Sequence, residues 1–164
     1  MKYKLNTVNY NEHHSELILN DLLIDRGIKN PEEWLRTSEK YENSPWLFND
    51  MMHAISLLKT TLSSREAKIC VVVDSDVDGF TSSSIILSLL KEITWGEQEV
   101  QYVIHPGKEH GIILNELPDD FDLLIVPDAG TNDVDAHMNL LKNDKKIIIL
   151  DHHEIDKIVD YKEY

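Results

Sequence analysis

The spacing of hydrophobic residues changes near residue 64 of this 164-residue chain, and the two parts predict different kinds of structure. Before that point the spacing is helical. One helix is expected to end near Gly27 and another to run over about 46–62, with a short turn opened by Asn30 and Pro31 between them. Residues 1–64 are therefore expected to form a helical lead-in.

After residue 64, short runs rich in Val and Ile alternate with helical segments. The expected strands are 67–74, 99–106, 121–128 and 145–151, and the expected helices are 81–93 and 133–144. This alternation predicts an α/β fold with a mostly parallel, doubly wound sheet in residues 65–164. Together with the lead-in, residues 1–164 would make a single lobe.

Acidic and histidine residues follow three of the predicted strands. They are Asp74, Asp76 and Asp78 after the first strand, Asp128 after the third, and Asp151, His152 and His153 after the fourth. The carboxyl ends of parallel strands meet at one edge of the sheet. Closely spaced aspartates repel one another unless a cation lies among them. Carboxylate and imidazole ligands suit Mn²⁺, and paired ions are common in phosphate-ester hydrolysis. The sequence therefore predicts a metal site.

The aspartate loop fits other patterns when it is taken alone. The D-x-D-x-D-G spacing from Asp74 matches the start of an EF-hand calcium loop, but Ile85 stands where a bidentate Glu is required. The D-x-D-G segment from Asp76 also resembles that of haloacid-dehalogenase-type phosphatases, although Phe80 replaces a threonine. The EF-hand is excluded, whereas the phosphatase stays open.

The three polar segments together resemble the first three motifs of the DHH phosphoesterase superfamily: DSDVDGFT (74–81), DAG (128–130) and DHH (151–153). Within it they are similar to RecJ-type single-strand-specific DNA exonucleases, as are LLIDRGIKNPEEWL (22–35) and VIHPGKEHGIIL (103–114). The resemblance implies Mn²⁺- or Mg²⁺-dependent release of 5′-nucleotides from single-stranded DNA.

The resemblance also assigns roles to individual residues. The metal ligands would be Asp74, Asp76, Asp78, Asp128 and His152, with Asp128 bridging two ions and Asp74 in a supporting place. The catalytic residues would be Asp151 and His153, with His153 contacting the scissile phosphate. Thr81 would be a second substrate-binding residue, unless its hydroxyl only caps the helix that follows.

The chain departs from the family pattern at two points. Ser75 stands where the RecJ group usually carries an aromatic residue. The chain also ends 11 residues after His153, whereas the family places another metal-binding aspartate and a second, substrate-clamping domain beyond that point. We expect a two-ion site that a second polypeptide or a missing domain completes. Besides a nuclease domain, two functions stay open: a phosphodiesterase for short oligonucleotides or cyclic dinucleotides, and a non-catalytic binding module.

Composition mainly affects the expected partners and location. The net charge of −14 gives a surface that does not attract phosphate backbones without metal ions or a local basic patch. Cys70 is the only cysteine and lies in an apolar run, so it is expected to be a buried thiol. No membrane-length apolar run is present, and we expect a cytoplasmic protein. His105 and His110 lie in a polar loop and could approach the substrate, but they are expected to be solvated, because no fixed ligand spacing links them to the site.

Overall fold

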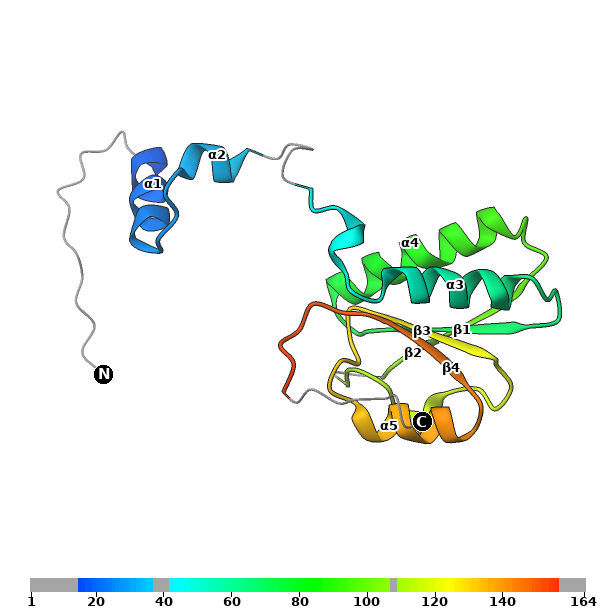
Figure 1. Cartoon of the computed structure of the whole chain (residues 1–164). Coiled ribbons are helices and arrows are strands. Elements are labelled where there is room, and N and C mark those ends of the chain that lie inside the picture. The colour runs from blue at the N-terminus through cyan, green and yellow to red at the C-terminus, as the bar shows by residue number, and fades with distance from the viewer. Residues whose placement is uncertain (1–14, 37–41, 107–108, 157–164) are drawn as a thin grey trace. The chain divides into compact units, whose positions relative to one another are not determined.

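The computed structural model describes residues 15–36, 42–106 and 109–156, which divide into two compact units after Leu47. The first unit contains α1 (Ser15–Asp25), α2 (Pro31–Leu35) and a 3₁₀ turn, Pro45–Leu47 (Figure 1).

Both ends predicted for the helices of the first unit are confirmed. Gly27 follows α1 with φ +86°, a conformation that favours glycine, and the next amide, that of Ile28, donates to the Leu23 carbonyl at 3.0 Å. Asn30 caps α2 by accepting a hydrogen bond from the amide of Glu33 at 3.3 Å, ahead of Pro31 in the first turn.

The second unit is an α/β fold, as predicted. Its elements are α3 (Met51–Leu62), β1 (Lys68–Val73), α4 (Val77–Ile93), β2 (Glu99–Ile104), the 3₁₀ turn η3 (Leu114–Glu116), β3 (Leu123–Pro127), α5 (Val134–Lys142) and β4 (Lys146–Leu150). The strands form one sheet in the order β2-β1-β3-β4, and every neighbouring pair is parallel.

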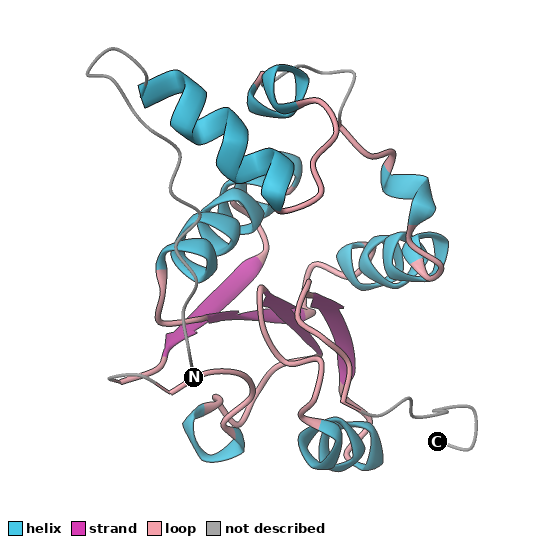
Figure 2. Ribbon diagram, turned by 90° about the vertical axis from the view of Figure 1, so that its left-hand side faces the viewer, coloured by secondary structure: helices cyan, strands magenta, loops and turns pink. Residues whose placement is uncertain are grey.

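Helices cover both faces of this sheet (Figures 1 and 2). Because side chains of a strand alternate between faces, Ile69 and Val71 of β1 pack toward α3 and α4, whereas Cys70 and Val72 pack toward α5. Cys70 is fully buried, as expected, and burial raises the pKa of its thiol to about 12. The arrangement is doubly wound.

Helix α3 starts later than the sequence pattern predicted. The expected helix from residue 46 is replaced by the 3₁₀ turn and a helix that begins at Met51, with Asp50 in the N-cap position. The carboxylate of Asp50 makes no capping hydrogen bond; only its carbonyl joins the helix, by accepting the amide of Ala54 at 2.9 Å. From there α3 packs Ala54, Leu57 and Leu58 against the sheet.

The order of the strands creates a switch point at the centre of the sheet. The chain leaves β1 toward β2 on one side and leaves β3 toward β4 on the other, while β1 and β3 are direct neighbours. Loops diverge there and open a crevice beyond the carboxyl ends of the strands. Asp74 and Asp128 follow these two strands directly.

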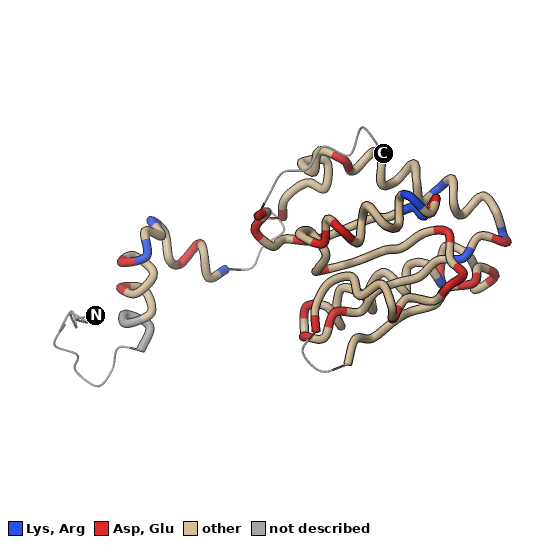
Figure 3. The backbone as a smooth tube through the Cα atoms, turned by 90° about the horizontal axis from the view of Figure 1, so that it is seen from below, with Lys and Arg blue, Asp and Glu red and all other residues tan. Residues whose placement is uncertain are grey.

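Acidic residues occur along most described segments, with Lys and Arg at few places (Figure 3). Among the described helices, none is long and apolar enough to cross a membrane.

Candidate metal centre

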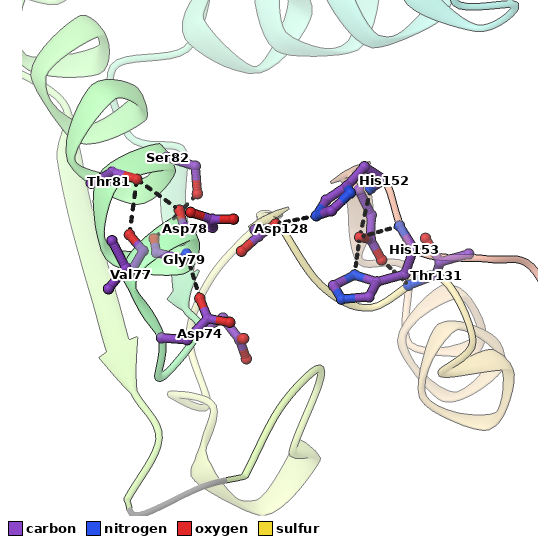
Figure 4. Close-up of polar contacts among 12 residues, drawn as sticks. Asp74, Val77, Asp78, Gly79, Thr81, Ser82, Asp128, Thr131, His152 and His153 are labelled. Carbon is purple, nitrogen blue, oxygen red and sulfur yellow. Dashed lines mark hydrogen bonds and ion pairs between the residues drawn. The ribbon is translucent and has the colours of Figure 1, made fainter. Parts of the chain in front are cut away.

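The junction of β1 and α4 brings the first aspartates to the carboxyl edge of the sheet (Figure 4). The Asp74 side chain is buried, with 2% exposed. Asp76 caps α4, since its carboxylate accepts the amide of Gly79 at 2.9 Å, and this hydrogen bond lowers the pKa of Asp76. A Cβ on Gly79 would lie 2.5 Å from the Cβ of Asp74, so only glycine lets the helix begin this close to the strand.

The early start of α4 changes the expected role of Thr81. The helix begins at Val77, four residues before its predicted start. Thr81 therefore lies inside the helix, and its hydroxyl donates to the carbonyls of Val77 at 2.9 Å and Asp78 at 3.1 Å. The prediction that Thr81 caps the helix is wrong because Asp76 takes that position. A phosphate contact by Thr81 stays a prediction.

Asp128 lies at the middle of the edge, between the side chains of α4 and the two histidines in Figure 4. Its backbone has φ +66°, and its amide donates to the carbonyl of Leu150 at 2.8 Å. Burial raises the pKa of its carboxyl group, and the charges of Asp76 and Asp78 raise it further. His152 places Nε2 at 3.2 Å from Oδ1 of Asp128. Burial and the two neighbouring carboxylates thus both disfavour the ionised form of Asp128, and a nearby cation would favour it.

The carboxylate of Asp151 accepts several hydrogen bonds that hold the segment after β4 in place. Its Oδ1 accepts the backbone amides of His152 and His153 and Nδ1 of His153, the last at 2.6 Å, while its Oδ2 accepts the amide of Thr131 at 3.0 Å. Burial alone would raise the pKa of Asp151, but these hydrogen bonds outweigh burial and hold it well below its usual range. Asp151 thus orients the side chain of His153, not that of His152.

A histidine that the sequence analysis expected to be solvated joins the edge from the segment after β2. Nδ1 of His110 lies 2.7 Å from Oδ2 of Asp74, which raises the pKa of His110. His105 is buried, with its ring nitrogens 2.7 Å from the Glu116 carboxylate and from the Gly111 carbonyl. The expectation of two solvated histidines is wrong for His105, and His110 is bound at the site.

Among the residues that the structure describes, two groups of side chains have the chemistry and spacing to hold divalent ions. One is Asp128, His152 and His153, and the other is Asp74, Asp76 and His110; within each group the ligand atoms lie within 4.8 Å of one another. Mixed carboxylate and imidazole donors fit Mn²⁺ or a similar ion. Asp78 belongs to neither group, yet it is close enough to raise the pKa of Asp128.

A cavity of about 630 Å³ opens beside this edge. Its polar side is formed by Asp128, Thr131, Asp151 and His152, and its apolar side includes Phe48, Met51, Leu150 and Ile155. The volume is in the range of small-molecule sites.

The chain is similar to one known family and to several known proteins. The profile of the DHH family, N-terminal domain, matches residues 68–163. The chain is 38% identical over 140 residues to a Bacillus subtilis protein named as a putative SPbeta prophage-derived single-strand DNA-specific exonuclease, YorK. It is 28% identical over 150 residues to the single-stranded-DNA-specific exonuclease RecJ of Bacillus subtilis and 27% identical over 142 residues to that of Haemophilus influenzae.

These matches cover most of this chain but little of the relatives. They span 85%, 86% and 83% of this chain and 24%, 19% and 24% of the respective relatives. The chain therefore spans a quarter or less of the length of these relatives. No solved structure matches it significantly.

Proposed function

We propose that this chain, which belongs to the DHH family, provides the metal-binding lobe of an exonuclease that degrades single-stranded DNA from the 5′ end. The observation that carries the proposal is the convergence of aspartates and histidines from three strand ends on one edge of a parallel sheet. The names of the relatives support the choice of substrate. The family match also favours this function over a haloacid-dehalogenase-type phosphatase.

The residues that would hold two divalent ions are Asp76, Asp78, Asp128 and His152, with Mn²⁺ or Mg²⁺ as the ion. When bound, such a pair of ions lowers the pKa of a water molecule and neutralises charge on phosphoryl oxygens. The raised pKa of Asp128 supports this assignment, because it marks a carboxylate whose ionised form needs a nearby cation. A bound ion would also counter the repulsion that the net charge of −14 exerts on DNA.

Asp151 and His153 would work as a pair, in which only His153 contacts the substrate. Asp151 holds Nδ1 of His153 at 2.6 Å, so the imidazole presents its other nitrogen away from the carboxylate. That nitrogen would contact an oxygen of the scissile phosphate. Asp151 itself would not touch the substrate; it would fix the ring and tie the β4 end to Thr131.

The cavity beside the site would accept the nucleotide that is released. Its polar side adjoins Asp128 and His152, where the phosphate would lie, and its apolar side offers Phe48 and Ile155 to the base. Aromatic and aliphatic surfaces bind bases with little sequence preference. The cavity therefore favours a substrate with exposed, unstacked bases.

The site would be completed from outside the described residues. Asp76, Asp78, Asp128 and His152 are few ligands for two ions, and the relatives extend well beyond the matched region. We infer that a second domain or a partner polypeptide supplies a further ligand and closes over the DNA. We also infer a cytoplasmic location, where such a substrate would be met.

Calorimetric titration of the chain with Mn²⁺, beside an assay with 5′-labelled single-stranded DNA, tests this function. We expect the wild type to bind Mn²⁺ and the double variant Asp76→Ala, Asp128→Ala to lose binding. Asp135→Ala, which removes an exposed carboxylate of α5, is the matched control and should bind as the wild type does.

The products separate the remaining functions. Mononucleotides released from long single strands support the exonuclease. Cleavage only of short oligonucleotides or cyclic dinucleotides indicates a small-substrate phosphodiesterase instead. Mn²⁺ binding without cleavage, even when a longer relative's C-terminal region is fused to the chain, indicates a binding module and contradicts the proposal.

A further inference from the structure

The segment Glu109–Ile112 is held against the metal edge by several contacts. The amide of Ile112 donates to Oδ2 of Asp133 at 2.7 Å, and the hydroxyl of Ser75 donates to the carbonyl of Glu109 at 3.1 Å. Gly111 has φ +82°, and a Cβ at this position would collide with the Asp133 carboxylate. The segment therefore has a defined place that sets where the intervening residue, His110, lies.

The contact between Asp74 and His110 fixes which ring nitrogen is available. A carboxylate has only acceptor atoms, so Nδ1 of His110, at 2.7 Å from Oδ2 of Asp74, carries the proton. In the neutral ring the lone pair then lies on Nε2. Buried carboxylates that hold one nitrogen of an imidazole in this way are the usual partners of metal-binding histidines.

The same arrangement occurs a second time at this edge. Asp151 holds Nδ1 of His153 as Asp74 holds Nδ1 of His110, and in both pairs the aspartate side chain is 2% exposed and the histidine side chain 57% exposed. Besides the hydrogen bond to Asp74, the charges of Asp76 and His153 also affect the pKa of His110, so these side chains lie near one another. His110 thus faces the same solvent-open space as the residues already assigned to the site.

We propose that His110 is an imidazole ligand of the ion held by Asp76, and that Asp74 is the buried carboxylate that positions it. This rests on the proposed function, since it assigns a residue to the same metal site. The ligand atoms of Asp74, Asp76 and His110 lie within 4.8 Å of one another, which places the imidazole within reach of that ion. The segment after β2 then adds one ligand to this ion site, from outside the three aspartate and histidine motifs.

An imidazole ligand also changes which ion the site prefers. Mg²⁺ favours oxygen ligands, whereas Mn²⁺ accepts nitrogen more readily. His110 therefore makes the site selective for Mn²⁺. Replacing it with an oxygen donor should move this preference toward Mg²⁺.

Pulsed electron paramagnetic resonance of Mn²⁺ bound to the full chain tests the proposal without reference to activity. Coupling of the ion to imidazole nitrogens is measured with isotope-labelled histidine, and affinity by calorimetry. We expect His110→Gln to remove one nitrogen coupling and to weaken Mn²⁺ binding at one ion site at least about tenfold. His53→Gln is the control, because His53 is an exposed histidine of α3 with its side chain 90% exposed.

Two further variants distinguish a failure of the role given to His110 from a failure of the proposed function. His110→Glu should restore part of the affinity and lower the ratio of Mn²⁺ to Mg²⁺ binding. Asp128→Asn tests the metal site as a whole. If the wild type binds Mn²⁺ and Asp128→Asn does not, yet His110→Gln keeps every nitrogen coupling and full affinity, the role of His110 is overturned while the proposed function stands. If the wild type binds no Mn²⁺, the proposed function itself fails.

Discussion

Two buried aspartates at this edge each hold an exposed histidine, but they come together in different ways. Asp151 and His153 are two residues apart, whereas Asp74 and His110 are 36 residues apart and come from different loops. The exposed fractions of the side chains are the same in both pairs. The geometry of the pairs is therefore similar, while its origin is local in one case and tertiary in the other.

The local pair also has more support from the backbone. Asp151 accepts three backbone amides besides the imidazole, whereas Asp74 accepts one distant amide, that of Gly111 at 3.4 Å. Asp74 depends instead on the segment that carries His110, and this segment depends on Asp133. The local pair should survive changes elsewhere in the fold, and the tertiary pair should not.

The largest expected effect is the loss of stability in Asp151→Asn. An amide can accept hydrogen bonds at only one atom, so its NH₂ group would face either the Thr131 amide or His153. We expect a loss of about 2–3 kcal/mol in the free energy of unfolding at pH 7, against about 1–2 kcal/mol for Asp74→Asn. Urea unfolding of both variants measures the difference.

Lowering the pH should reduce the difference in stability between the wild type and Asp151→Asn. The folded-state pKa of Asp151 lies below that of an unfolded Asp, so its stabilising effect is complete above about pH 4 and is lost as the pH falls through the folded-state value. Wild type and Asp151→Asn should converge in stability under acid. An equal gap at pH 7 and pH 2 would contradict the role given to the hydrogen bonds of Asp151.

The second prediction breaks the tertiary pair alone. Gly111→Ala puts a methyl group against the Asp133 carboxylate at a backbone φ of +82°, so we expect a loss of about 2 kcal/mol and displacement of His110 from Asp74. Gly96→Ala is the matched control, because Gly96 has φ +72° with nothing within 4 Å of an added Cβ. It should cost only about 1 kcal/mol. Equal losses would mean that the segment has room to adjust.

The fold was predictable where the pattern is local. Short apolar runs located all four strands of the sheet, and their alternation with helices predicted that the strands are parallel. The order of the strands was not predicted. The start of α4 was missed because the pattern of hydrophobic residues begins at residue 85, while the helix begins at an aspartate cap. A cap is decided by a single hydrogen bond, and Asp76 could serve as a cap or as a ligand on sequence grounds alone.

The candidate site was predictable to the same extent. Residues that directly follow strands were placed correctly at one edge, because parallel strands carry their ends there. His110 lies six residues beyond β2, where no period or spacing fixes the direction of a side chain. Its place depends on Gly111 and Asp133, which meet only in the folded chain. Tertiary contacts of this kind leave little trace in one sequence.

Titration of His110 and His153 in the metal-free protein compares the Asp74–His110 and Asp151–His153 pairs directly. The hydrogen bond from Asp74 raises the pKa of His110, and that from Asp151 raises the pKa of His153, so both should titrate above about 6.5 in NMR spectra recorded with a chelator. Their stabilising effect is complete below that pH and is lost as the pH rises through the folded-state values.

Variants should separate the two titrations. Asp74→Asn should return the pKa of His110 toward its ordinary value and leave the pKa of His153 raised. Asp151→Asn should have the reverse effect. If either variant shifts the pKa values of both histidines equally, the two pairs act as one unit and the distinction between them fails.

The smallest expected effect concerns Ser75, whose hydroxyl donates to the carbonyl of Glu109 at 3.1 Å. Ser75→Ala removes this exposed hydrogen bond, and we expect a loss of about 0.5 kcal/mol in urea unfolding. Because Glu109 precedes His110, the variant should also lower the titration midpoint of His110 slightly and leave that of His153 unchanged. Ser64→Ala, at a turn remote from the edge, controls for the loss of a surface hydroxyl. A Ser75→Ala protein with an unchanged His110 would show that Gly111 and Asp133 alone place the histidine, and the tertiary pair would then depend on one anchor instead of two.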